Sequence, residues 1–285
     1  MKATSAYSQG FSLLLRQRKV WVLFYLFNIF VSLLFIAPVA LFLDNLLSKN
    51  LYGERLLRNF DVQWVLEVIH NYPKLPAFIL VNGLVIIALY MLFHAVFLSG
   101  AINLFHTKER YTFAGFLRGV AIYFPRFLRF YILSLILYGL FFGAMGFLIN
   151  KFQFLIKDSI EQTPVLWFNW CKAGILLLGL SILQLLFDIT RVSLVVDNQT
   201  KTMKALWKNV KFFVKTPGPF VFLFSIFLGV MGIVFALQAL IFNSFPKSSI
   251  LLAFIFFLFQ QCFILAKIGY RLHFYASLTL LYQKK

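Results

Sequence analysis

The sequence predicts an all-α polytopic membrane protein, with six transmembrane helices in three hairpins and amphipathic helices at the membrane surfaces. Of its 285 residues, 61% are hydrophobic and 13% are charged, whereas a soluble domain carries about 25% charged residues. Six apolar segments are long enough to cross the ~30 Å hydrocarbon core of a bilayer. Basic residues gather between these segments, which is the pattern that orients helices in a membrane.

The six expected spans cover residues 20–43, 77–104, 127–149, 165–196, 219–243 and 249–281. The first span is longer than the apolar region of a signal peptide, so we expect it to be retained. Proline is tolerated at the start of a helix, because the N–H that it lacks would have no partner there. Prolines mark the expected entry to five spans, at Pro76, Pro125, Pro164, Pro217 and Pro246.

The distribution of basic residues predicts the topology. Sixteen of the 27 Lys and Arg lie in the N-terminal segment, in residues 105–129 and 201–215, and at the C-terminal end, against eight in the other three connections. The positive-inside rule then places both termini in the cytoplasm. The net charge of +18 could suggest nucleic-acid binding, but its position beside the spans favours orientation instead, so we expect no nucleic-acid partner.

A repeated unit predicts the internal organisation. The pairs Phe11 and Lys19, Phe116 and Phe124, and Trp207 and Lys215 are each eight residues apart. Each pair belongs to an expected amphipathic helix that leads straight into a span. We therefore expect one transmembrane domain over 1–285, built from repeats at 1–105, 106–197 and 198–285. In the first outer connection, helical spacing predicts a further surface helix that presents Leu57, Phe60, Trp64 and Val68.

The segment 201–215 predicts a helix with two unlike faces. The expected apolar face consists of Met203, Leu206, Trp207, Val210 and Val214, and the basic face of Lys204, Lys208, Lys211 and Lys215. Such a helix suits the headgroup layer of a membrane. The lysines can be a topology signal alone, or they can bind anionic lipid or an acidic protein partner.

Polar residues inside the spans form the second candidate site. Gln184, Asp188 and Arg191 share one face of the fourth span, and Lys267 and Arg271 share a face of the sixth with Gln260. Asp188 and Arg191 are spaced to pair within their own helix. This cluster is interpreted either as an ion pair that fixes helix packing, or as a site for an anionic headgroup or substrate between the fourth and sixth helices.

The chain resembles the YciC-type family of bacterial inner-membrane proteins, a family related in layout to the membrane domain of some glycerophosphodiester phosphodiesterases. The residues that carry the resemblance are Arg191–Asp197, Ala205–Trp207, Lys211–Pro219 and Phe263–Tyr282, which includes Arg271 and His273–Tyr275. The resemblance implies a bacterial inner-membrane location and six helices with amphipathic segments on the inner face. It implies no activity.

The sequence contains no GxSxG, HExxH, Walker A or strand-associated GxGxxG motif, each of which would supply a known chemistry. We expect no catalytic residues, no metal and no cofactor, and hence no enzyme. The leading hypothesis is a scaffold or accessory subunit that organises lipid or a larger membrane assembly. Its expected partners are membrane lipids, chiefly anionic ones, and other proteins or further copies of the chain. The alternative is a transporter or lipid-handling protein that uses Asp188, Arg191 and Arg271.

Overall fold

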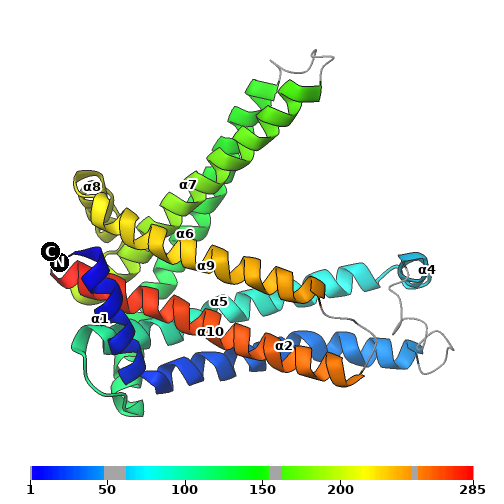
Figure 1. Cartoon of the computed structure of the whole chain (residues 1–285), viewed down its shortest axis with the longest axis horizontal. Helices are drawn as coiled ribbons and strands as arrows, with labels where there is room; N and C mark the ends of the chain where they lie inside the picture. The colour runs from blue at the N-terminus through cyan, green and yellow to red at the C-terminus, as the bar shows by residue number, and fades with distance from the viewer. Residues whose placement is uncertain (1, 48–61, 154–161, 245–249, 285) are drawn as a thin grey trace. The chain divides into compact units, whose positions relative to one another are not determined.

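The computed structural model describes residues 2–47, 62–153, 162–244 and 250–284, and every regular element in these ranges is an α-helix (Figure 1). The helices are α1 (Ala3–Arg16), α2 (Arg18–Leu47), α4 (Val62–Asn71), α5 (Leu75–Thr107), α6 (Phe113–Gln153), α7 (Gln162–Val196), α8 (Thr202–Lys215), α9 (Gly218–Ser244) and α10 (Ile250–Gln283). The predicted all-α class is confirmed.

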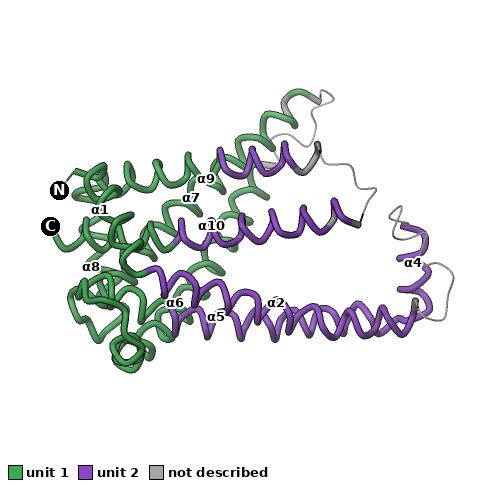
Figure 2. The backbone as a smooth tube through the Cα atoms, turned by 60° about the horizontal axis from the view of Figure 1, so that its bottom comes forward, with its two compact units in different colours: residues 1–17, 98–232, 272–285 green, residues 18–97, 233–271 purple. Residues whose placement is uncertain are grey.

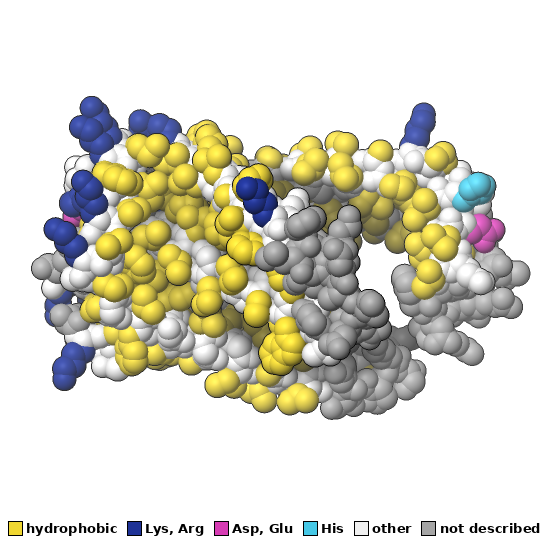
Figure 3. Space-filling model, turned by 90° about the horizontal axis from the view of Figure 1, so that it is seen from above, with side chains coloured by type: hydrophobic (Ala, Val, Ile, Leu, Met, Phe, Trp, Pro, Cys, Tyr) yellow, Lys and Arg dark blue, Asp and Glu magenta, His cyan; other side chains and the backbone are white. Residues whose placement is uncertain are grey.

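Six of the described helices, α2, α5, α6, α7, α9 and α10, are long and apolar enough to cross a membrane. Each contains most of one predicted span. The face of the molecule in Figure 3 is covered largely by hydrophobic side chains, as expected where helices contact lipid rather than water. The chain is therefore a multi-pass integral membrane protein.

The backbone divides into two compact units, coloured separately in Figure 2. Unit 1 comprises residues 1–17, 98–232 and 272–285, and unit 2 comprises residues 18–97 and 233–271. Both candidate sites contain residues of unit 1. The packing of unit 1 therefore determines which side chains meet in each site.

The end of α10 forms the centre of unit 1, because every residue from Leu272 to Tyr282 is buried. A helix that is buried all round needs partners on every side. Contacts with α10 come from α1 at Tyr7, from α7 at Asp188, from α8 at Asn209 and from α9 at Phe227. This buried segment includes the polar residues His273, Ser277 and Thr279.

α6 and α7 lie side by side as a hairpin (Figure 1). Its buried residues lie toward one end. The buried stripe of α6 ends at Ser134 and that of α7 begins at Leu185. Between these two positions, none of the described residues whose burial is assigned is buried. This part of the hairpin presents apolar side chains outward, as lipid contact requires.

The expectation that Pro125 marks the start of a span is wrong, because α6 runs through Pro125 without a break. A proline inside a helix removes one backbone hydrogen bond and normally disturbs the helix. Here one buried face, which includes Phe116, Tyr123, Phe127 and Phe130, extends across the proline and packs in unit 1. Residues 113–124 are accordingly the first turns of α6 and not a separate surface helix.

The other prolines agree with the prediction where the structure describes them. Pro76 and Pro164 lie in the first turns of α5 and α7, and Pro217 immediately precedes α9. Pro246 lies outside the described residues, as do Leu57 and Phe60 of the predicted outer surface helix. Trp64 and Val68 lie in α4.

α1 packs against protein on one face instead of lying wholly in lipid. Ala3, Ala6 and Gly10 are buried, and Phe11 is exposed. A Cβ atom added to Gly10 would meet the backbone of Ser277 on α10, with the Ser277 Cα at 2.8 Å. Gly10 therefore permits a close approach of the two helices that a larger residue would prevent.

Candidate functional site

The first candidate site is an ion pair within α7. Arg191 Nη1 lies 2.7 Å from Asp188 Oδ1, and the Asp188 residue is 0% exposed and Arg191 6% exposed. Three residues separate the two side chains, which places them on the same helix face. The predicted pairing is confirmed, and both charges lie inside unit 1.

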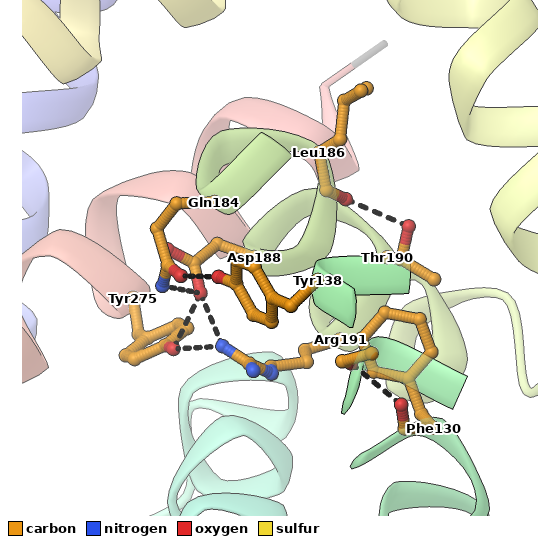
Figure 4. A network of polar contacts seen from close by, with 9 residues as sticks. Phe130, Tyr138, Gln184, Leu186, Asp188, Thr190, Arg191 and Tyr275 are labelled. Carbon is orange, nitrogen blue, oxygen red and sulfur yellow. Dashed lines mark hydrogen bonds and ion pairs between the residues drawn. The ribbon is translucent and has the colours of Figure 1, made fainter. Parts of the chain in front are cut away.

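Tyr275 of α10 joins this pair from a different helix (Figure 4). Its hydroxyl donates to Asp188 Oδ1 at 2.7 Å and accepts from Arg191 Nη1 at 3.2 Å. Tyr275 is itself 1% exposed. Through this one hydroxyl, α10 contacts both members of the α7 pair.

Gln184 and Tyr138 extend the network toward α6. Gln184 Nε2 donates to both Asp188 oxygens, at 3.4 and 3.3 Å, and the Tyr138 hydroxyl donates to Gln184 Oε1 at 2.6 Å. The Asp188 carboxylate thus accepts from three side chains. A buried carboxylate in this state has little capacity left for a ligand.

Aromatic rings complete the surroundings of Arg191. Its guanidinium carbon lies 4.9 Å from the ring centre of Tyr131 and 5.9 Å from that of Phe130, both on α6. Contacts of this kind stabilise a cation that has been removed from water. Arg191 Nε–H is buried and has no hydrogen-bond partner in the part of the chain that the structure describes.

Lys267 and Arg271 belong to unit 2, and Gln184, Asp188 and Arg191 belong to unit 1. Lys267 is exposed, and its Nζ lies 5.2 Å from the ring centre of Phe235. That Arg271 joins the ion pair stays a prediction. The α10 residue that does reach the pair, Tyr275, was missed, although it lies one helical turn beyond Arg271 in the sequence.

The second candidate site is the lysine face of α8, formed by Lys204, Lys208, Lys211 and Lys215, which are all exposed. Lys208 Nζ lies 2.8 Å from Asp197 Oδ2. Lys211 Nζ lies 5.6 Å from the ring centre of Trp207. The predicted basic face is present, and one of its four lysines is paired with an acid of the same unit.

α8 has three faces instead of the two that were predicted. Leu206 is buried in unit 1 with Ala205 and Asn209, so its assignment to the exposed apolar face was wrong. The rest of that face stays outward: Met203 is 61%, Trp207 62% and Val214 73% exposed, and Val210 is half-buried. An exposed apolar stripe therefore runs between the buried face and the lysine face.

A polar seam, formed by Asn209, Ser193, Tyr282 and Asp197, holds α8 on the core. Asn209 Nδ2 donates to Ser193 Oγ of α7 at 2.6 Å. The Tyr282 hydroxyl lies 2.8 Å from Asp197 Oδ2 and 3.3 Å from Asn209 Oδ1. This seam was not predicted, although the position of Asn209 opposite Trp207 on the helical wheel indicates a third face.

Among the described residues, no group of three or more His, Cys, Asp or Glu side chains could hold a metal ion. Cys171 and Cys262 are free and exposed. The described polar residues near Asp188 therefore do not form a metal site.

Comparison of the chain with protein-family models gave no match, and comparison with curated proteins and with solved structures gave none either.

Proposed function

We propose that the chain is a non-enzymatic scaffold or accessory subunit of the bacterial inner membrane, that it organises lipid or a larger membrane assembly, and that both its termini lie in the cytoplasm. The observation that carries this proposal is the engagement of Asp188. Its carboxylate accepts from Arg191, Tyr275 and Gln184 inside a buried cluster. Polar groups in a membrane bundle that satisfy one another hold helices together.

The engagement of the ion pair supports a packing role over a transport role. A transported solute must displace existing partners of the site on each cycle, and here three donors would have to release one carboxylate. The network also joins α6, α7 and α10. A contact of this kind fixes the positions of the three helices along one another. The resemblance to the YciC-type family agrees with this proposal, since it too implies a membrane layout without a catalytic site.

α8 is the proposed contact with lipid. Its exposed Met203, Trp207 and Val214 suit insertion at the acyl boundary, and the adjacent lysine face suits anionic headgroups. Each lysine near a negatively charged surface contributes about 1 kcal/mol to such binding. The polar seam beneath α8 keeps this surface fixed to the core.

The lipids that co-purify with the chain in mild detergent test this role. The double variant Lys204→Gln/Lys215→Gln should lower the enrichment of anionic over zwitterionic lipid by at least about tenfold, from the contribution of two lysines. The control Lys151→Gln/Lys172→Gln removes two lysines elsewhere in unit 1 and should leave the enrichment unchanged. Equal enrichment in all three proteins would reject α8 as the lipid contact.

One observation favours the alternative of a transporter or lipid-handling protein, namely the buried Nε–H of Arg191 without a described partner. A buried donor of this kind can receive an anionic group or a water molecule. Asp188→Asn in a reconstituted uptake assay separates the two functions. The scaffold requires unchanged solute and lipid flux, and a large loss of flux with retained folding would favour the transporter.

A further inference from the structure

Unit 2 contains a cavity of about 410 Å³ where α4 meets α5 beside the C-terminal half of α2. Its wall includes Pro38 and Phe42 of α2, Tyr72, and Phe78 of α5, and Lys74 is the one charged residue among the described residues that line it. The rings of Phe42 and Tyr72 meet edge to face at 5.4 Å. An apolar wall with one cation at its border suits an anionic amphiphile.

A second cavity of about 320 Å³ lies along the same pair of helices. It is lined by Asn28, Ser32 and Ile36 of α2 and by Ile87 and Tyr90 of α5, among others. Phe35 of this cavity and Pro38 and Phe42 of the first follow one another at three- and four-residue steps, which places them on one face of α2. The two cavities are therefore consecutive parts of one groove along the α2–α5 seam.

Pro38 gives a local reason for the groove. A proline inside a helix cannot donate to the carbonyl one turn earlier and pushes against it. The nearby Phe35 carbonyl accepts a hydrogen bond from Asn82 Nδ2 of α5 at 3.4 Å. The carbonyl that Pro38 leaves without its helical donor is that of Leu34, the residue before Phe35. Asn82 thus links α2 and α5 at the level where the two cavities meet.

The length of the groove matches a lipid chain. From Asn28 to Phe42 the helix advances 14 residues, or about 21 Å at 1.5 Å per residue. The span of α2 ends at Leu46 and that of α5 begins at Leu75. Lys74 therefore lies at the border of the apolar region, where lipid headgroups are found.

We propose that the α2–α5 groove of unit 2 binds one anionic phospholipid, with an acyl chain along the groove and the phosphate beside Lys74. The apolar walls select a hydrocarbon chain, and the single cation selects a negatively charged headgroup over a zwitterionic one. This site uses no residue of α8 or of the Asp188 network, so it does not rest on the proposed function.

Photo-crosslinking tests this site directly. The purified chain in mild detergent is irradiated with a phosphatidylglycerol that carries a diazirine in one acyl chain, and the crosslinked peptides are identified by mass spectrometry. Crosslinks should concentrate in residues 28–42 and 72–90. Unlabelled phosphatidylglycerol should compete about fivefold better than phosphatidylcholine with the same chains, as one lysine predicts.

Three variants define the result. Lys74→Gln should abolish the headgroup preference, and Ile87→Trp, which adds bulk at an exposed position in the groove, should reduce crosslinking for both lipids. Lys151→Gln, an exposed lysine at the end of α6, should change neither. Equal competition by the two lipids, or crosslinking that is unaffected by both groove variants, would overturn the proposal. The α8 double variant, which tests the proposed function, should leave this crosslinking unchanged.

Discussion

Breaking the Asp188–Arg191 pair on one side should cost more stability than removing both of its charges. Asp188→Leu leaves the Arg191 guanidinium inside unit 1 without its counter-charge, because Arg191 is 6% exposed. A buried charge that loses its partner destabilises a protein by about 3–5 kcal/mol. The double variant Asp188→Leu/Arg191→Met replaces both charges by apolar side chains, but it also removes these partners of the Tyr275 hydroxyl and the Gln184 amide, so it should cost about 1–3 kcal/mol.

Tyr275→Phe provides a milder case. It removes the hydrogen bonds of the Tyr275 hydroxyl to Asp188 and Arg191 and keeps the ring. Hydrogen bonds between membrane helices contribute about 0.6 kcal/mol each on average, so this variant should lose roughly 1 kcal/mol. The free energy of unfolding can be measured for all variants by titrating bicelle-embedded protein with SDS and following helix content.

The double-mutant cycle gives the decisive quantity. If the single costs of Asp188→Leu and Arg191→Met add up to the cost of the double variant, the two side chains do not stabilise each other. That result would refute the assignment of the pair as a packing contact. A loss below about 0.5 kcal/mol for Asp188→Leu, which is the range of ordinary surface substitutions, would refute the burial on which the estimate depends.

Further outcomes follow from the packing of unit 1 and from the charge of α8. Gly10→Ala should loosen α1 and speed its hydrogen exchange, because its Cβ would meet Ser277, whereas Gly139→Ala, where nothing lies within 4 Å, should stabilise the helix by up to about 1 kcal/mol. Asn209→Leu should speed exchange in α8 by removing the 2.6 Å bond to Ser193; exchange confined to other helices would contradict the seam. Raising the ionic strength from 0.1 to 1 M should weaken the anionic-lipid preference of the lysine face of α8, since the screening length falls from about 10 to about 3 Å; a salt-independent preference would exclude an electrostatic origin.

The six spans could be predicted from the sequence because the bilayer sets a length and a composition that each span must meet by itself. The Asp188–Arg191 pair could also be predicted, because residues three apart lie on the same face of one helix. Tyr275 could not be assigned in this way, because its role depends on which residues of α7 and α10 lie opposite each other. Neither amphipathicity nor hydropathy fixes that register.

The prediction for α8 was wrong where an apolar side chain could contact either protein or lipid. Leu206 and Trp207 are consecutive apolar residues of α8, and the first is buried in unit 1 while the second is exposed. In water, both would be expected to face the core, but in a membrane an apolar residue can face protein or lipid at similar cost. The small and polar residues Ala205 and Asn209 mark the protein side better than hydrophobicity does. Pro125 misled for a related reason, since the packing of α6 in unit 1 outweighs a local helix-breaking tendency.

The central position of Leu272–Tyr282 has a consequence for biogenesis. All other helices of unit 1 precede this segment in the chain, so the ribosome delivers them to the membrane before the element around which they pack. Until α10 arrives, Asp188 and Arg191 have each other but lack the Tyr275 hydroxyl. The nascent protein must therefore pass through an open intermediate, during which insertion machinery or chaperones can shield the exposed polar face of α7.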